Sequence, residues 1–272
     1  MALALTYLFV PGDRPDRFDK AAAAGADAVI LDLEDAVAPE AKDRAREAIG
    51  DWLTRHAEDF SRIVVRINDI HSPWWTDDLA LLSRTGVMLA MLPKAESAAQ
   101  VDTVAAALHD DGCVIPLIET ARGVQEVEEV ANAKGVLRLA FGTLDYTVDL
   151  DIAGDERALL YPASRIVIAS RCAGIVAPVA GVTPTLDDDE QLRSDLAFER
   201  ALGFRAKLLI HPRQVAVVRD ALLPSAAELA WARKVLAAAA ADGAQGAVQV
   251  DGRMVDRPVI RKAQAILARA LR

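Results

Sequence analysis

The stretch Val114-Ile-Pro-Leu-Ile-Glu119 decides the fold, because it joins a short continuous apolar run to an acidic residue. A run of this length is typical of a strand that is buried on both faces, as in a parallel sheet. Two further segments have the same form: Ile63-Val-Val-Arg66 ends on a cation, and Leu139-Ala-Phe-Gly142 is followed by Asp145. If these strands are neighbours, two carboxylates and a guanidinium meet where their carboxyl ends converge.

Eight such runs occur in the first 212 residues, separated by stretches of helical character. They cover residues 7–10, 28–33, 63–67, 88–92, 114–118, 137–141, 174–179 and 207–210. Ser97-Ala-Ala-Gln100 offers a capping box for one of the intervening helices. Eight strand-then-helix units predict a (β/α)₈ barrel of the TIM type, with a doubly wound open sheet as the alternative.

The last part of the chain is surplus to a barrel. We therefore expect a catalytic barrel domain over residues 1–212 and a C-terminal extension over residues 213–272. The extension contains two helical stretches, 214–222 and 226–242, and a last helix over 258–271. Between them, residues 247–255 are predicted to form a hairpin with Asp251-Gly252 in its turn. We expect this extension to act as a lid or as a subunit contact.

Composition excludes several classes of protein. The chain has 272 residues, 53% of them hydrophobic, so a large core is possible. The formal net charge of -9 argues against a general nucleic-acid binder or a membrane-surface protein. The sequence has no signal-peptide pattern and no apolar run of about 18 residues, which favours a soluble cytoplasmic protein.

Charged residues follow most of the predicted strands. In a barrel, the residues after the carboxyl end of each strand line the active site. These residues are Arg14 after the first strand, Asp32, Glu34 and Asp35 after the second, Arg66 after the third, Lys94 and Glu96 after the fourth, Glu119 after the fifth and Asp145 after the sixth. Carboxylate oxygens beside a fixed cation favour a site for Mg²⁺ and an anionic oxo-acid.

Several segments together resemble the citrate lyase β-subunit family of the HpcH/HpaI aldolase superfamily. They are Leu8-Phe-Val-Pro-Gly-Asp-Arg-Pro-Asp-Arg17, Ala26-Asp-Ala-Val-Ile-Leu-Asp-Leu-Glu-Asp-Ala-Val37, Val65-Arg-Ile-Asn68, Leu92-Pro-Lys-Ala-Glu96, Ile118-Glu-Thr-Ala121, Phe141-Gly-Thr-Leu-Asp-Tyr146 and Ile210-His-Pro-Arg-Gln214. The match extends to Asp251-Gly-Arg-Met-Val-Asp-Arg-Pro258. The resemblance implies a (β/α)₈ barrel, a homotrimer, a Mg²⁺ site and a CoA-thioester substrate.

The resemblance also implies roles for the residues at the strand ends. It makes Glu119 and Asp145 the Mg²⁺ ligands, although each could instead cap the helix that follows it. It makes Arg66 the residue that binds the substrate carboxylate, although an ion pair with Glu34 or Asp35 is also possible. Glu34 would hold Arg66 and metal-bound water, or cap the next helix.

Three further residues are expected to contact the CoA part of the substrate. Arg14 and Lys20 lie around a helix start at Pro15, and we expect them to bind the phosphates of CoA, with a solvated helix face as the alternative. Asp256 matches an acidic residue that enters the active site from a neighbouring subunit in related enzymes and transfers a proton at the acetyl carbon. Its alternative role is to cap the last helix.

These residues together indicate a Mg²⁺-dependent carbon–carbon lyase, or the reverse Claisen-type synthase. The expected substrate is a 3-hydroxyacyl-CoA with a further carboxylate, such as citryl-CoA or malyl-CoA, which gives an oxo-acid and acetyl-CoA. Two alternatives stay open: a pyruvate aldolase of the HpcH/HpaI type that needs no CoA, and a subunit of a citrate lyase complex that depends on an acyl carrier protein. An acidic carrier would be repelled by a chain of charge -9.

Overall fold

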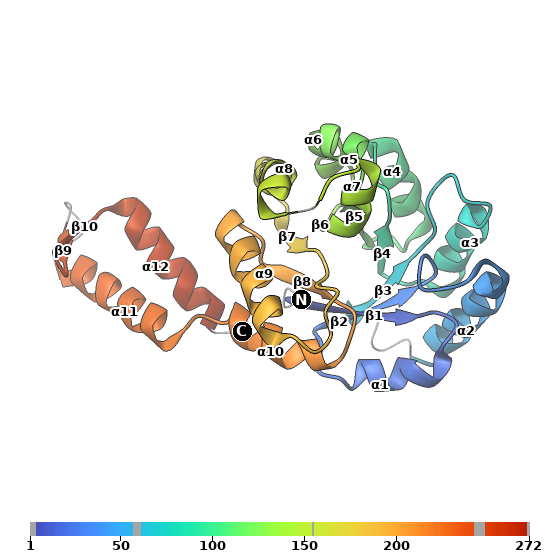
Figure 1. Cartoon of the computed structure of the whole chain (residues 1–272), viewed down its shortest axis with the longest axis horizontal. Coiled ribbons are helices and arrows are strands. Elements are labelled where there is room, and N and C mark those ends of the chain that lie inside the picture. Colours follow the sequence, from blue (N-terminus) through green and yellow to red (C-terminus); the bar gives the residue numbers. More distant parts are fainter. Residues whose placement is uncertain (1–3, 57–60, 154, 242–247, 271–272) are drawn as a thin grey trace. The chain divides into compact units, whose positions relative to one another are not determined.

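The first part of the chain folds into a closed barrel of eight parallel strands (Figure 1). The structure is a computed structural model that describes residues 4–56, 61–153, 155–241 and 248–270. The strands follow one another around the barrel in chain order: β1 (Thr6–Pro11), β2 (Ala28–Asp32), β3 (Ile63–Arg66), β4 (Leu89–Leu92), β5 (Cys113–Ile118), β6 (Arg138–Phe141), β7 (Val176–Ala180) and β8 (Ala206–Leu209).

The closure of the barrel is explicit in the pairing of its first and last strands. β8 pairs in parallel with β1, with Leu208 opposite Tyr7 and Leu209 opposite Leu8. An open sheet would leave these two strands as unpaired edges. The predicted (β/α)₈ barrel is therefore confirmed and the doubly wound alternative is excluded.

Helices surround the barrel, and each strand is followed by at least one of them (Figure 1). They are α1 (Phe18–Ala22), α2 (Lys42–Arg55), α3 (Trp75–Thr85), α4 (Ala98–Ala107), α5 (Ala121–Gln125), α6 (Val127–Ala131), α7 (Thr143–Asp149), α8 (Glu156–Cys172), α9 (Asp189–Leu202) and α10 (Arg213–Leu222), with short 3₁₀ turns η1 (Pro15–Arg17) and η2 (Pro39–Ala41). Within the described ranges, no helix combines the length and the apolar character needed to cross a lipid bilayer.

The strands are apolar on both faces because each face is covered. Alternate side chains point into the barrel, where they form one cluster: Tyr7, Ala28, Ile30, Val64, Leu89, Met91, Ile115, Leu117, Ala140, Val179, Ala206 and Leu208. The intervening side chains, such as Leu31 and Val65, are equally buried. The barrel interior is thus a packed core, as is usual for this fold.

The residues from Arg219 onward form a second compact unit. It contains α11 (Ala226–Ala241), the antiparallel strands β9 (Val248–Val250) and β10 (Arg253–Val255), and α12 (Arg257–Ala270). Asp251 and Gly252 both have positive φ, as a tight hairpin turn requires. The unit has its own apolar core, made of Ala232, Val235, Val250, Val255, Ala263 and Ile266.

Candidate active site

The carboxyl ends of the barrel strands surround a cavity of about 330 Å³. In the parallel register Asp32 lies opposite Arg66, so the last residues of β2 and β3 are neighbours at this mouth. The cavity is lined by Phe9, Asp32, Asp35, Ala36, Arg66, Leu117, Glu119, Gly142, Thr143, Leu144, Asp145, Val182, Leu208 and Ile210. Arg66, Glu119 and Asp145, expected at one mouth from sequence, therefore line a single cavity.

Arg66 is fixed by a two-pronged ion pair with Asp32. Its Nε and Nη2 donate to the two carboxylate oxygens of Asp32 at 2.7 and 2.6 Å, and its Nη1 lies 2.7 Å from Oε2 of Glu34. The guanidinium also lies over the ring of Phe9, 4.8 Å from its centroid. Burial opposes the positive charge, but the adjacent Asp32 outweighs it and raises the pKa of Arg66, so this residue is a permanent cation.

The partners expected for Arg66 from the sequence therefore left out the principal one. Glu34 is a partner of Arg66, and Asp35 lies 3.8 Å away, but the principal partner is Asp32. Sequence reasoning placed Asp32 at the strand end without a role. The missed signal was the matching position of Asp32 and Arg66 as the last residues of consecutive strands, which pairs them across the sheet.

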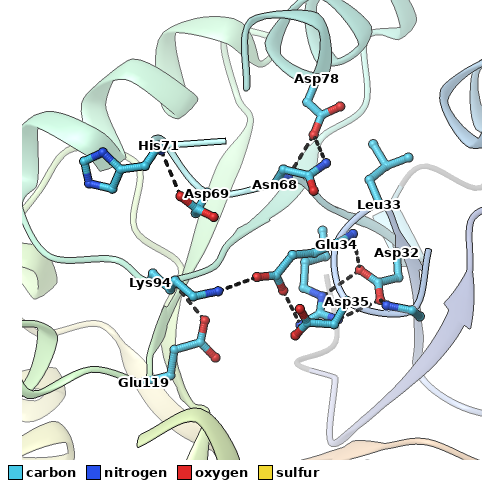
Figure 2. A network of polar contacts seen from close by, with 12 residues as sticks. Asp32, Leu33, Glu34, Asp35, Asn68, Asp69, His71, Asp78, Lys94 and Glu119 are labelled. Carbon is cyan, nitrogen blue, oxygen red and sulfur yellow. Dashed lines mark hydrogen bonds and ion pairs between the residues drawn. The ribbon is translucent and has the colours of Figure 1, made fainter. Parts of the chain in front are cut away.

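Glu34 joins Arg66 to Lys94. Its Oε1 accepts a hydrogen bond of 2.8 Å from Nζ of Lys94 (Figure 2), while its Oε2 forms the ion pair with Nη1 of Arg66. Burial raises the pKa of Glu34, against the effect of Arg66. The helix-capping alternative for Glu34 is not seen, because the turn that begins the next helical segment follows Ala38.

Glu119 is a buried carboxyl group at the mouth with a strongly raised pKa. It is 1% exposed, and its Oε1 accepts a hydrogen bond of 2.8 Å from the backbone N–H of Lys94. Burial, reinforced by the nearby carboxylates of Glu34 and Asp145, raises the pKa of Glu119 to about 8. A carboxyl group in this position needs either a proton or a cation. The next helix, α5, is capped by Thr120, so Glu119 does not serve as its cap.

Asp145 lies in the first turn of α7 and lines the same cavity as Glu119. Between them is Gly142, the residue before α7, where an added Cβ would overlap Oε2 of Glu119. Among the described residues, no group of three or more His, Cys, Asp or Glu side chains is arranged around a possible metal ion. The donors fit Mg²⁺, which typically takes one or two carboxylates and keeps water or substrate oxygens at its other positions.

A buried polar network holds the loops after β2 and β3 together. Nζ of Lys42, from α2, donates to the backbone oxygens of Leu33 and Glu34 and to Oδ1 of Asn68 at 2.6 to 2.8 Å. Asn68 in turn donates from its backbone and side-chain nitrogens to Asp78 of α3 (Figure 2). This network fixes the segment that carries Glu34. The sequence did not reveal Lys42, because a lysine in a polar helix normally faces solvent.

Three predicted residues of the barrel, Glu34, Arg14 and Lys20, do not line this cavity, although Glu34 pairs with Arg66, which does. Arg14 is partly exposed and its guanidinium pairs with Asp16 at 3.0 and 3.1 Å, while Lys20 is exposed on α1. The helix predicted at Pro15 begins as a 3₁₀ turn and continues as α1. Asp256 lies in the second unit, where its Oδ1 accepts a hydrogen bond from the N–H of Val259 in α12. Its alternative role as a helix cap is thus present in the structure.

Comparisons with known proteins agree with this architecture. The sequence profile of the HpcH/HpaI aldolase/citrate lyase family matches residues 5–212. A citrate lyase subunit beta-like protein of Deinococcus radiodurans is 38% identical over 98% of this chain and 97% of its own length. An L-malyl-CoA/beta-methylmalyl-CoA lyase of Cereibacter sphaeroides is 35% identical over 97% of this chain and 93% of its own length.

A solved structure gives the same result at the level of the fold. The crystal structure of CitE from Mycobacterium tuberculosis in complex with magnesium, acetoacetate and coenzyme A superimposes with a TM-score of 0.89. It is 40% identical in sequence, and the match covers 100% of this chain and 99% of that one. The similarity therefore includes both units of the chain and not the barrel alone.

Proposed function

The chain belongs to the HpcH/HpaI aldolase/citrate lyase family, and from this premise we propose that it is a Mg²⁺-dependent carbon–carbon lyase. Its substrate is a 3-hydroxyacyl-CoA with a further carboxylate, such as citryl-CoA or malyl-CoA, and its products are an oxo-acid and acetyl-CoA. The reverse reaction is a Claisen-type synthesis. The single observation that supports this most strongly is the buried Glu119, which shares a cavity with Asp145 and Arg66.

The mouth of the barrel binds and orients the oxo-acid half of the substrate. Glu119 and Asp145 are the residues that hold Mg²⁺, which supplies Lewis-acid stabilisation of charge on the substrate oxygen. Arg66 binds the substrate carboxylate, and its rigid pairing with Asp32 fixes the direction of its remaining N–H groups. Glu34 holds Arg66 through its Oε2 and Lys94 through its Oε1, and so helps to orient the cation that binds the substrate.

Asp256 is the proton-transfer residue in this proposal. In cleavage, the substrate hydroxyl gives its proton to water as it becomes the oxo group, the electrons of the broken carbon–carbon bond pass to the acetyl carbon, and Asp256 in its acid form protonates that carbon. In synthesis the ionised Asp256 removes that proton, and water returns a proton to the new hydroxyl. Proton transfer by a positioned residue typically contributes about 10²- to 10⁴-fold to the rate. We assign this role to Asp256 acting in the site of a neighbouring subunit. Asp256→Asn separates catalysis from capping, because asparagine keeps an oxygen for the N–H of Val259 but cannot transfer the proton.

The remaining parts of the proposal concern CoA and assembly. Arg14 and Lys20 bind the phosphates of CoA. To do so, Arg14 gives up its ion pair with the exposed Asp16 and pairs with a phosphate instead. Assembly into a homotrimer is supported by exposed apolar side chains on α7 and α8, namely Val148, Leu160 and Tyr161, which are 80%, 42% and 64% exposed. A subunit contact on this side of the barrel would cover these side chains.

An activity panel tests the function directly. The purified chain is assayed with citryl-CoA, malyl-CoA and β-methylmalyl-CoA, and in reverse with acetyl-CoA and glyoxylate, with and without Mg²⁺. We expect Mg²⁺-dependent turnover of at least one CoA thioester, with Glu119→Gln and Asp145→Asn inactive. Turnover of a 2-oxo-acid aldol without CoA would instead identify a pyruvate aldolase. Turnover only after addition of an acyl carrier protein would identify a dependent subunit. Full activity in both variants would refute the metal site.

A further inference from the structure

The loop that follows β4 contains a lysine with a strained backbone. Lys94 has a φ of 46°, in the left-handed region that long side chains rarely adopt. Within the described ranges, Asp151 and Asp251 are the only other non-glycine residues with positive φ. Such a conformation persists where the surrounding contacts enforce it, and it is often found at functional sites.

The contacts of Lys94 connect the two acidic residues on either side of it (Figure 2). Its backbone N–H donates to Oε1 of Glu119 at 2.8 Å, and its Nζ donates to Oε1 of Glu34 at 2.8 Å. The following residue, Ala95, donates from its N–H to the carbonyl of Leu117 in β5. The strained turn therefore holds the loop against β5 and directs one backbone N–H at the carboxylate that follows this strand.

The second oxygen of Glu119 faces another element. A Cβ added at Gly142 would overlap Oε2 and would lie 2.6 Å from the Cβ of Glu119, so the carboxylate occupies the space that glycine leaves. Gly142 immediately precedes α7, which carries Asp145. Oε1 of Glu119 is therefore hydrogen-bonded to the loop after β4, while Oε2 of Glu119 lies on the side of Gly142 and α7.

We propose that Lys94 is a positioning residue that restricts Glu119 to a single metal-binding oxygen. This inference rests on the proposed Mg²⁺ site. The N–H of Lys94 fixes the direction of the carboxylate, so that Oε2 is the oxygen turned toward Gly142 and α7, where a cation shared with Asp145 would bind. Mg²⁺ requires near-octahedral coordination, whereas Ca²⁺ accepts bidentate carboxylates and more ligands. The backbone conformation of Lys94 therefore favours Mg²⁺ over Ca²⁺ and keeps the other coordination positions open to substrate oxygens.

Two substitutions at one position separate the backbone from the side chain. Lys94→Gly and Lys94→Val both remove the amine, but glycine adopts positive φ freely and valine strongly resists it. Metal binding is measured without substrate, by calorimetric titration with Mg²⁺ and Ca²⁺ and by the electron paramagnetic resonance spectrum of bound Mn²⁺. We expect Lys94→Gly to bind Mg²⁺ within about threefold of the wild type. Lys94→Val should bind it about 10- to 100-fold more weakly and lose the preference over Ca²⁺.

The outcomes distinguish this inference from the proposed function. If both variants bind Mg²⁺ like the wild type, with unchanged discrimination against Ca²⁺, the positioning role is overturned while the metal site stands. If the wild type itself binds no Mg²⁺, the proposed function and this inference fall together. If Lys94→Val shows no cooperative thermal unfolding, Lys94→Ala takes its place, and we expect it to bind Mg²⁺ several-fold more weakly than Lys94→Gly.

Discussion

Two carboxyl groups of the barrel, the buried Glu119 and the partly buried Glu199, have raised pKa values but different neighbours. Glu199, in α9, accepts two hydrogen bonds from Nζ of Lys207, at 2.7 and 2.9 Å, on the outer side of β8. Burial raises the pKa of Glu199 to about 7 although Lys207 opposes it, and Lys207 is fully buried. At Glu119, burial and the neighbouring acids act in the same direction, and together they raise the pKa to about 8.

The difference shows that the balance of charge, more than burial, separates a structural ion pair from a candidate site. Glu199 has one cation for one carboxylate. The charged side chains that line the mouth cavity are four acids, Asp32, Asp35, Glu119 and Asp145, and one base, Arg66. Such an excess of negative charge is stable only with protons or a bound cation. The raised pKa values alone would not have told the two places apart.

The largest expected effect comes from Glu119→Gln, with Glu199→Gln as its matched control. Loss of a metal ligand should lower kcat/KM by about 10³-fold or more, because the metal is expected to supply several kcal/mol. The thermal unfolding midpoint of metal-free Glu119→Gln should be unchanged or higher, since the substitution removes repulsion between carboxylates. Steady-state kinetics and calorimetric unfolding of both variants measure this. Equal loss of activity in the two variants would contradict the distinction drawn here.

The pH dependence of Mg²⁺ binding should be the next largest effect. Mg²⁺ displaces the proton of Glu119, so affinity should rise about tenfold per pH unit up to the pKa of about 8 and then level off. The raised pKa also means that the contribution of Glu119 to the stability of the metal-free protein is full below the ordinary carboxyl pKa and is lost as pH rises through about 8. Calorimetric titrations between pH 6 and pH 9 measure the affinity. A flat profile, or one that falls with pH, would disagree with the environment assigned to Glu119.

Arg66→Lys should have an intermediate effect. Lysine cannot reproduce the two-pronged pairing with Asp32, so the orientation of the cation toward the substrate carboxylate is lost. We expect KM for the oxo-acid to rise about 10- to 100-fold, with a smaller change in kcat. Arg62→Lys serves as the control, because Arg62 donates only to the backbone oxygens of Ala26 and Asp27 among the bonds described. A KM that is unchanged by Arg66→Lys would remove this residue from the binding site.

The smallest effect on activity is expected for Glu199→Gln. It leaves Lys207 buried without its anionic partner, so the free energy of unfolding should fall by about 3 kcal/mol. Because the pair lies between β8 and α9 and does not line the mouth cavity, kcat/KM should stay within about twofold of the wild type. Chemical denaturation and steady-state kinetics give the two numbers. A stable but inactive Glu199→Gln would move this residue into the catalytic machinery.

The fold could be predicted from sequence because its strands are covered on both faces. All eight strands were placed to within two residues, since a continuous apolar run stands out between polar helices. The capping box also formed as expected: Ser97 accepts from the N–H of Gln100, and Gln100 accepts from the N–H of Ser97. These signals are local, and the sequence carries them directly.

The site could be predicted only in part, because its details depend on contacts between distant segments. The positions of Glu119, Asp145 and Arg66 followed from the rule that strand ends share one mouth. The role of Asp32, the buried amine of Lys42 and the strained backbone of Lys94 did not, because each depends on partners that lie elsewhere in the chain. The Glu199–Lys207 pair escaped notice for the same reason.

The most direct test of the central claim is a crystal structure of the protein soaked with Mn²⁺, with anomalous scattering used to locate the ion. We expect one strong peak at the barrel mouth, about 2 Å from an oxygen of Glu119 and an oxygen of Asp145. The same crystals of Glu119→Gln should lack the peak. A peak elsewhere, or an empty mouth with Glu119 and Asp145 turned apart, would contradict the account.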